Sequence, residues 1–286
     1  MSKSIAITGT TGRLGCALQR HFESAGWSTV GLNRSLLDLN EPDRIAEVLE
    51  KFHFDALIHP AAITSLESCE ADPEQARRVN ATAPSLIAAH CAALSLPMIH
   101  VSTDYVFDGK TSKLRTETDP AHPINVYGDS KRAGEESVIA AHPSAWVARV
   151  SWLFGPDKAG FVEAILDRAQ SGEPVQAIED KYSVPSYTED VCRAFEGLLG
   201  LSRQEGGVIH VCNRGQTDWH SYAEEIFRYT GRTSQVVERL ALRDMDVFIA
   251  ERPIHTAMDP GRLEGLLGRP MRRWQDALAH YLSSTM

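Results

Sequence analysis

A glycine-rich turn near the start of the chain constrains the fold more than any other feature. Ser4–Thr8 is a short apolar and β-branched run that predicts a strand, and residues 14–25 have a helical pattern. Between them lie Gly9, Gly12 and Gly15, with the spacing G-x-x-G-x-x-G. The first glycine permits the tight turn, the second lets a pyrophosphate approach the backbone, and the third lets the helix pack on the strand. The sequence therefore predicts a dinucleotide-binding turn, with the amides of the helix N-terminus facing the phosphates.

The rest of the first half repeats this strand–helix rhythm. The alternation predicts an α/β fold of the Rossmann type, a doubly wound parallel sheet with helices on both faces. We expect residues 1–154 to form the dinucleotide-binding domain, with a segment of about 186–213 returning to its sheet. Strands are predicted at residues 28–33, 56–59, 98–103 and 146–151, and helices at 40–52, 72–94 (kinked near Pro84) and 127–141.

After residue 154 the chain changes, because Gly and Pro interrupt short elements more often. Residues 155–185 and 214–286 are expected to form a smaller, interleaved substrate-binding lobe. Further predicted elements are a helix at residues 188–201, a strand at 208–212, and helices at 218–229 and 273–282.

Charge and cysteine content exclude several classes of protein. Lys and Arg total 29 against 38 Asp and Glu, a formal net charge of −9, which argues against proteins that coat nucleic acid or an anionic membrane. No apolar run approaches the roughly 18 residues of a membrane-spanning helix, and no signal peptide is visible. The five cysteines form no Cys-x-x-Cys pair and the eleven histidines form no ligand cluster, so we expect neither a disulfide framework nor a bound metal. A cytoplasmic protein is the expectation.

The end of the predicted second strand carries positive charge where NAD-binding proteins carry negative charge. An acidic residue there binds the ribose hydroxyls of NAD, whereas Arg34 and Ser35 suit a 2′-phosphate, and Arg13 would add a second positive contact. The alternative is that both arginines are solvated loop residues. We predict that NADPH is preferred over NADH. The cofactor-binding residues predicted from these two segments are Gly9, Thr11, Gly12, Arg13, Leu14, Gly15, Asn33, Arg34, Ser35, Asp38 and Leu39, with Asp38 and Leu39 near the adenine.

Tyr127 and Lys131 form a Tyr-x-x-x-Lys pair at the start of a predicted helix. Residues four apart share a helix face, which places a phenol beside an ammonium. The positive charge should lower the pKa of Tyr127 from its usual value of about 10. Such a tyrosine can protonate a carbonyl oxygen while hydride arrives at the carbon. The pair alone is common and usually structural, but here it follows a long predicted loop, residues 104–125, and a hydroxyl-bearing strand end at Ser102 and Thr103.

These residues belong to motifs that resemble the extended short-chain dehydrogenase/reductase family over nearly the whole chain. Within it, the likeness is to the dTDP-4-dehydrorhamnose reductase branch. The motifs are Ser102-Thr-Asp-Tyr-Val-Phe-Asp-Gly109, Glu117-Thr-Asp-Pro, Pro123-Ile-Asn-Val-Tyr-Gly-Asp-Ser-Lys-Arg-Ala-Gly-Glu135, Arg149-Val-Ser-Trp-Leu-Phe154, Thr217-Asp-Trp-His-Ser-Tyr222 and Arg252-Pro-Ile-His-Thr-Ala-Met-Asp259.

The resemblance implies NADP or NAD as cofactor and a nucleotide-diphospho-4-keto-6-deoxy sugar as substrate, here dTDP-4-dehydrorhamnose reduced to dTDP-L-rhamnose. It implies that Thr103 hydrogen bonds the sugar oxygen, Tyr127 protonates it, and Lys131 binds the nicotinamide ribose and tunes the tyrosine. The further residues expected in the site are Ala61 and Ala62 along the cofactor, Asp104, Tyr105 and Trp152 beside the sugar, and Arg252 as the cation for the substrate pyrophosphate.

Several positions depart from the pattern of the branch. It usually has Asn-Ala where this chain has His59-Pro60, and Val-Asp where it has Leu66-Glu67. Ser183 and Ser186 replace a usual glycine and threonine. These changes border the substrate pocket, so they bear on the identity of the sugar more than on the chemistry. Some relatives bind magnesium at a dimer interface through a glutamate at the position of Ala17, so no metal is expected here.

Two other functions remain open from the sequence. A nucleotide-sugar epimerase or dehydratase shares the fold and recycles its nicotinamide, although Asp104 and Tyr105 stand where dehydratases often have a second acid or base. The regulatory β subunit of methionine adenosyltransferase also resembles this branch and keeps a tyrosine–lysine pair, so a non-catalytic cofactor-binding subunit is the second alternative. A homodimer is left open as well.

Overall fold

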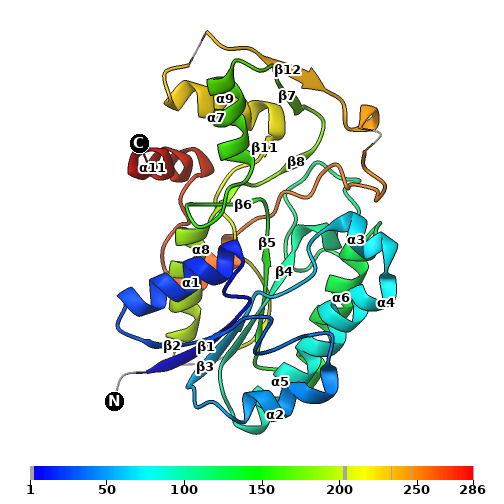
Figure 1. Cartoon of the computed structure of the whole chain (residues 1–286), viewed down its shortest axis with the longest axis vertical. Coiled ribbons are helices and arrows are strands. Elements are labelled where there is room, and N and C mark those ends of the chain that lie inside the picture. Colours follow the sequence, from blue (N-terminus) through cyan, green and yellow to red (C-terminus); the bar gives the residue numbers. More distant parts are fainter. Residues whose placement is uncertain (1–2, 202–204, 233, 246, 286) are drawn as a thin grey trace.

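A six-stranded parallel sheet forms the centre of the molecule, with helices on both faces (Figure 1). The computed structural model describes residues 3–201, 205–232, 234–245 and 247–285. The predicted doubly wound architecture is confirmed, and the five strands predicted in the first half lie within one residue of the predicted positions. In spatial order the strands are β10 (Gly207–His210), β5 (Trp146–Val150), β4 (Met98–Thr103), β3 (Ala56–His59), β1 (Ser4–Thr8) and β2 (Ser28–Leu32).

Side chains on neighbouring strand positions enter two separate cores, because successive residues of a strand point to opposite faces of the sheet. On β4, Ile99 and Val101 pack into one core, while Met98 packs into the other. The first core lies under α1 (Arg13–Ser24), α8 (Thr188–Leu199) and α10 (Gly261–Leu267). The second lies under α2 (Ile45–Leu49), α5 (Ala83–Ala93) and α6 (Val126–Ala141). Figure 1 shows α1 and α8 on one side of the sheet and α2, α5 and α6 on the other.

The helix predicted at residues 72–94 is interrupted near Pro84, as expected, and the interruption is a π-helical turn. Pro84 has no backbone N–H, so it cannot donate to the carbonyl of Asn80 four residues earlier. The segment therefore consists of α4 (Pro73–Arg77), the π-helical turn η2 (Arg78–Thr82) and α5. By contrast, the helix predicted at residues 40–52 is shorter than expected: it consists of the 3₁₀ turn η1 (Pro42–Arg44) followed by α2.

The second half adds a lobe with a core of its own above the sheet edge (Figure 1). β10 returns to the main sheet and pairs with β5, whereas the other short strands pair within and beside the lobe. The remaining elements are α3 (Leu66–Ala71), η3 (Asp104–Val106), β6 (Leu153–Phe154), α7 (Phe161–Ser171), β7 (Val175–Ile178), β8 (Tyr182–Ser183), β9 (Ser186–Tyr187), β11 (Thr217–Asp218), α9 (Trp219–Tyr229), β12 (Val237–Leu240), η4 (Leu242–Asp244) and α11 (Trp274–Thr285).

The strand order places a switch point beside β1. From β1 the chain passes to β2 on one side and then crosses to β3 on the other. In open parallel sheets, ligands bind at the carboxyl ends of the strands at such a point. The glycine-rich turn follows β1 there, so the fold brings the predicted cofactor residues to this edge. No helix among the described residues is long and apolar enough to cross a membrane.

Candidate active site

One cavity of about 850 Å³ opens at the carboxyl ends of β1, β3 and β4. It brings together most of the residues that the sequence predicts for cofactor, catalysis and substrate, although they come from segments far apart in the chain. Its lining includes Gly9, Thr11, Gly12, Arg13, Leu14, Gly15, Arg34, Asp38, Leu39, Ala61, Ala62, Thr103, Asp104, Tyr105, Tyr127, Lys131 and Trp152.

The glycine-rich turn forms a tight cradle at the middle of the cavity. Gly9 has φ +61°, and its N–H donates to the Leu32 carbonyl at 2.8 Å. A Cβ on Gly15 would lie 2.1 Å from the Gly9 carbonyl oxygen, so only glycine lets α1 approach this closely. The N-cap of α1 is Gly12, which has no side chain to accept from the first amides of the helix. These amides are therefore available to an anion, and the cradle fits the pyrophosphate of a dinucleotide.

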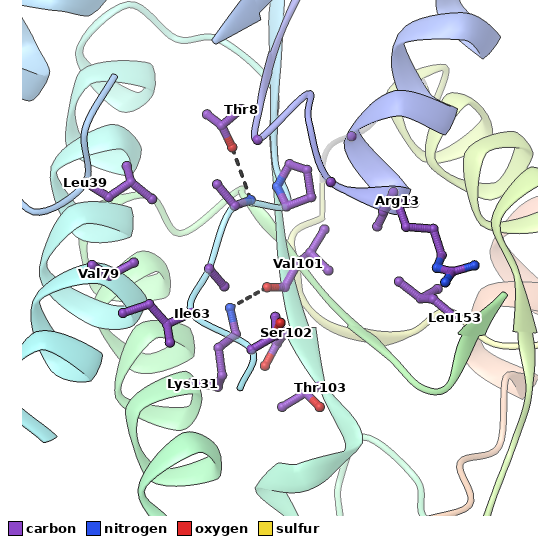
Figure 2. Close-up of a pocket in the computed structure, with 18 of the residues that line it drawn as sticks. Thr8, Arg13, Leu39, Ile63, Val79, Val101, Ser102, Thr103, Lys131 and Leu153 are labelled. Atoms are coloured by element: carbon purple, nitrogen blue, oxygen red, sulfur yellow. Dashed lines mark hydrogen bonds between the residues drawn. The ribbon is translucent and has the colours of Figure 1, made fainter. Parts of the chain in front are cut away.

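An apolar wall lies at one end of the cavity. Figure 2 shows Leu39, Ile63 and Val79 gathered on the same side, across from Arg13 and Leu153. A flat heteroaromatic base such as adenine suits a wall of this kind. Arg34 lines this end with 78% of its side chain exposed, and its Nε lies 3.8 Å from Oδ2 of Asp38. The charge of Arg34 is thus only weakly engaged within the protein.

Asn33 and Ser35, which the sequence predicts to bind the cofactor, are not among the residues that line this cavity. Asn33 Oδ1 accepts hydrogen bonds from the Ser35 N–H, the Ser35 hydroxyl and the Leu36 N–H, so this side chain closes its own turn. Ser35 lines a smaller adjoining hollow of about 270 Å³ with Arg34 and Arg44. Glu41 lines the same hollow and pairs with Arg44 at 2.7 Å, which leaves Arg34 as the cation best placed for a phosphate there.

Arg13 lines the cavity but is engaged within the protein, and its predicted contact with a 2′-phosphate remains a prediction. Its guanidinium donates to the carbonyl oxygens of Gly155 at 3.1 Å and Ala159 at 2.9 Å. Figure 2 shows the side chain directed toward Leu153, away from the apolar wall. The reason is that the carbonyls of the segment after β6 present acceptors that satisfy its donors. Arg13 therefore links α1 to the second lobe.

The catalytic residues predicted from the sequence lie together at the other end of the cavity. Thr103 ends β4, and Tyr127 and Lys131 lie on the first turns of α6. All three side chains are buried. Lys131 Nζ donates to the Val101 carbonyl at 2.7 Å (Figure 2). Burial lowers the pKa of the Lys131 ammonium to about 8, and the negative charge of Glu135 opposes this shift.

The pKa of Tyr127 is raised, whereas the sequence suggested that Lys131 would lower it. Burial of the phenol is the main cause, because a phenolate is poorly solvated there, and a hydrogen bond with Thr103 opposes the shift. The nearby charge of Asp104 raises the pKa of Tyr127 further. In the protein without ligand, Tyr127 is therefore a protonated phenol.

Asp104 lies fully inside the protein beside these groups. Its carboxylate accepts hydrogen bonds from the hydroxyls of Thr103 at 3.2 Å, Ser183 at 2.8 Å and Thr256. Burial raises the pKa of Asp104, and the positive charge of Lys181 is the largest opposing effect. Because Ser183 and Thr256 belong to the second half, the carboxylate joins the end of β4 to the lobe.

Two aromatic residues line the same end of the cavity. Tyr105 packs edge-on against Tyr127, with ring centroids 5.8 Å apart. Trp152 has φ +36°, a backbone conformation that is strained for any residue other than glycine. Its buried indole nitrogen has no hydrogen-bond partner within the described part of the chain. Strain and an unpaired donor at a cavity wall are typical of a ligand-binding position.

The sequence matches the family described as RmlD substrate binding domain over residues 3–286. The chain belongs to this family. The match confirms the resemblance to the extended short-chain dehydrogenase/reductase branch that the motifs indicated. It also covers the described part of the chain in full, both the sheet and the lobe.

Individual relatives agree with the RmlD family assignment. The probable low-salt glycan biosynthesis reductase Agl14 of Haloferax volcanii is 32% identical, covering 96% of this chain and 95% of its own length. The dTDP-4-dehydrorhamnose reductase of Mycolicibacterium smegmatis is 31% identical, covering 97% of this chain and 84% of its own. The crystal structure of dTDP-4-dehydrorhamnose reductase from Bacillus anthracis in complex with NADP is 26% identical, with a TM-score of 0.93 and full coverage of both chains.

In this member of the RmlD family, the residues that depart from the usual pattern make specific contacts. His59 Nδ1 lies 2.8 Å from the Thr8 hydroxyl, and its ring stacks on that of His100 at 5.4 Å. Burial and the charge of Lys131 lower the pKa of His59 to about 3, so both rings form a neutral layer under the catalytic end. Ser183, in place of the usual glycine, donates to Asp104, as described above.

Arg252 is not among the residues that line the cavity, and its predicted contact with the substrate pyrophosphate remains a prediction. Its guanidinium donates to the carboxylate of Glu67 and to the Ala250 carbonyl. Glu67 stands where the branch usually has Asp, and its carboxylate forms an ion pair with Arg252. The charge of Arg252 still reaches Tyr105 and Lys181 electrostatically.

Sequence reasoning missed a buried ion pair and a buried lysine at this site. The Glu135 carboxylate forms a bidentate pair with Arg149, at 2.8 and 2.6 Å, and accepts from the Ser102 hydroxyl at 2.6 Å. Together with Ser102 this pair joins α6 to β4 and β5 beside the predicted catalytic residues. Lys181 is fully buried beside Tyr105 and Trp152. A lysine in a short polar loop segment resembles a solvated residue, so the sequence carries no signal that could have found it.

Proposed function

We propose that this protein is an NADPH-dependent reductase of the 4-keto group of a nucleotide-diphospho-6-deoxy sugar, with dTDP-4-dehydrorhamnose as its substrate and dTDP-L-rhamnose as its product. One observation carries the proposal: Thr103, Tyr127 and Lys131 lie in the same cavity as the glycine cradle. Relatives that bear the name dTDP-4-dehydrorhamnose reductase, and a neighbour solved with NADP, support the choice of substrate and cofactor.

The cavity suits NADPH along its length. The cradle of Gly9, Gly12 and Gly15 would hold the pyrophosphate, Leu39 would lie against the adenine, and Arg34 and Ser35 would receive the 2′-phosphate. When bound, NADPH supplies a hydride to the carbonyl carbon of the sugar. Lys131 is placed to donate to the nicotinamide ribose, and Ala61 and Ala62, which have no bulky side chains, leave room for the cofactor along β3.

Tyr127 supplies the proton in this proposal. Because burial raises its pKa, the phenol is protonated at neutral pH and can donate to the keto oxygen as negative charge develops there. Thr103 holds the oxygen in place by a hydrogen bond. After the transfer Tyr127 carries the negative charge, which the Lys131 ammonium on the same helix face stabilises. Tyr105 and Trp152 would pack on the sugar ring.

The experiment follows NADPH oxidation with dTDP-4-dehydrorhamnose and identifies the product. Tyr127→Phe should lower kcat by about 100- to 10,000-fold, because it removes a positioned proton donor, and should leave the Kd for NADPH unchanged. Tyr229→Phe on α9 is the matched control and should retain full activity. Wild-type activity in Tyr127→Phe would remove that residue from its proposed role.

Other outcomes would favour the alternatives. Tightly held cofactor with no net NADPH oxidation, but with an altered sugar product, would indicate an epimerase. NADPH binding without turnover of any keto sugar would indicate a regulatory subunit. We also propose a cytoplasmic location, and a homodimer remains a prediction that sedimentation of the purified protein can check.

A further inference from the structure

Lys181 occupies an unusual position for a lysine. It lies between β7 and β8 with none of its surface exposed to solvent. A buried ammonium is costly unless other groups compensate its charge. Its Nζ donates to the Pro253 carbonyl at 3.0 Å and lies over the rings of Tyr105 at 4.8 Å and Trp152 at 5.7 Å. Cation–π contacts of this kind attract an ammonium but do not neutralise it.

The opposite charge that acts on Lys181 is the carboxylate of Asp104. The two groups form no direct ion pair, but both are buried, and the hydroxyl of Ser183, two residues after Lys181, donates to this carboxylate at 2.8 Å. The two groups attract each other, and this attraction opposes the effect of burial on the pKa of each. Arg252, the other cation nearby, repels Lys181 but is paired with Glu67. Ser183 and Thr256 donate to the same carboxylate oxygen of Asp104 and so keep it in place.

The Asp104 carboxylate also acts on the proton donor. Its negative charge disfavours the phenolate of Tyr127. In the proposed reaction the phenolate forms as the proton passes to the keto oxygen, so an uncompensated carboxylate beside Tyr127 would oppose that step. A cation that offsets Asp104 removes the penalty.

We propose that Lys181 is a positioning residue of the reaction: its ammonium neutralises Asp104 beside Tyr127 and holds the Tyr105 and Trp152 rings at the sugar end of the cavity. This inference rests on the proposed function, because it assigns Lys181 a part in the same proton transfer.

A double-mutant cycle that removes the charges of Lys181 and Asp104 tests the proposal in the full-length protein. Lys181→Met keeps most of the side-chain volume but leaves Asp104 uncompensated, and we expect kcat to fall by about 10- to 100-fold with no change in the Kd for NADPH. Adding Asp104→Asn should restore most of the lost kcat, because removing both members of a buried pair is tolerated better than removing one. An asparagine can still accept from Ser183 and Thr256. Lys51→Met, at an exposed lysine paired with Glu47, is the control and should behave as wild type.

A purely structural role would give a different pattern. If Lys181 only filled space, Lys181→Met would retain wild-type kcat, and that result would overturn the proposal. A loss of kcat that the second substitution does not reverse would overturn it too. Urea unfolding of the wild type, Lys181→Met, Asp104→Asn and the double variant provides a second cycle, which does not depend on the substrate. Strong coupling between the two substitutions in the free energy of unfolding supports the pair, and additive effects contradict it.

The two proposals can fail separately. If the wild-type protein does not reduce the sugar, the proposed function fails, and the unfolding cycle alone then decides whether Asp104 and Lys181 form a pair. If the wild-type protein is active and Lys181→Met is equally active, the proposed function stands and the role of Lys181 fails.

Discussion

The two ends of the cavity are built by opposite means. The cofactor end consists of backbone amides, small residues and an apolar wall, and its charge is carried by Arg34, which is mostly exposed. The sugar end consists of charged groups that are withdrawn from solvent, namely Asp104, Lys131 and Lys181. The first end depends on shape and on the absence of side chains. The second depends on the balance between positive and negative charge.

This difference determines how each end should respond to substitution. A backbone cradle tolerates changes at its exposed rim but not at a position where a Cβ would strike the main chain. A network of buried charges responds as a unit, because the loss of one member leaves another without its partner. Effects at the sugar end should therefore be coupled, and effects at the cofactor end should be local.

The largest effect is expected at Gly15. A Cβ there would lie 2.1 Å from the Gly9 carbonyl oxygen and 2.9 Å from Cα of Thr10, so Gly15→Ala must displace the backbone of the cradle. We expect the affinity for NADPH to fall by about 100-fold or more, together with a loss of stability. Isothermal titration with NADPH and urea unfolding measure the two quantities.

Gly12→Ala is the matched control for this prediction. A Cβ on Gly12 would meet only the Gly9 carbonyl oxygen, at 3.3 Å, and the backbone of Gly12 has φ −91°. The free energy of unfolding should therefore change little, while NADPH binding weakens because the methyl group occupies the space for the pyrophosphate. Equal losses of stability in the two variants would contradict the steric explanation.

The second prediction concerns pH at the sugar end. Burial lowers the pKa of both Lys131 and Lys181 to about 8, from the usual value of a lysine near 10.5. Each ammonium is present below this pH and is lost as the pH rises through it. The kcat/KM for the keto sugar should be constant near neutrality and fall above about pH 8, by at least about tenfold per pH unit where one required proton is lost.

The cofactor end supplies the contrast for this measurement. Adenosine 2′,5′-bisphosphate contacts only that end in the proposed arrangement, so its Kd should stay constant over the alkaline range. The double variant of Lys181→Met and Asp104→Asn retains only the Lys131 ionisation, and its profile should fall less steeply than that of the wild type. A flat wild-type profile through pH 9 to 10 would show that neither ammonium is required.

The contrast between the two ends also explains what could be predicted from the sequence. The cradle follows from glycine spacing and strand–helix alternation, both of which are local patterns, and all three glycines line the cavity as predicted. The Tyr127–Lys131 pair follows from helix geometry for the same reason. By contrast, the contacts of Asp104 reach residues 79 and 152 positions further along the chain, and no local pattern encodes them.

The contacts that the sequence did not predict have the same origin. Arg13 and Arg252 are cations in suitable motifs, but acceptors elsewhere in the fold engage them first: the Gly155 and Ala159 carbonyls for Arg13, and Glu67 for Arg252. The pKa of Tyr127 was misjudged because the helix spacing accounts for the nearby ammonium but not for burial. Tertiary packing decides each of these cases. A single sequence reveals a tertiary contact only where the contacting residues belong to one motif.

The smallest effect is expected at Arg34. Its side chain is 78% exposed and lies 3.8 Å from Asp38, so it contributes little to stability, and its value to the protein is the charge that it offers to a 2′-phosphate. Arg34→Ala should reduce the preference for NADPH over NADH by about fivefold, which is the upper end of what an exposed ion pair contributes. The ratio of kcat/KM for the two cofactors measures this preference, and Arg20→Ala, on α1 and paired with Asp157, is the control. Because NADH lacks the phosphate, its own kcat/KM should not change.

Two other outcomes would change this interpretation. An unchanged ratio would mean that another group, with Ser35 and Arg44 as the candidates in the adjoining hollow, selects the phosphate. A larger loss would show that the cofactor end is as tightly coupled as the sugar end.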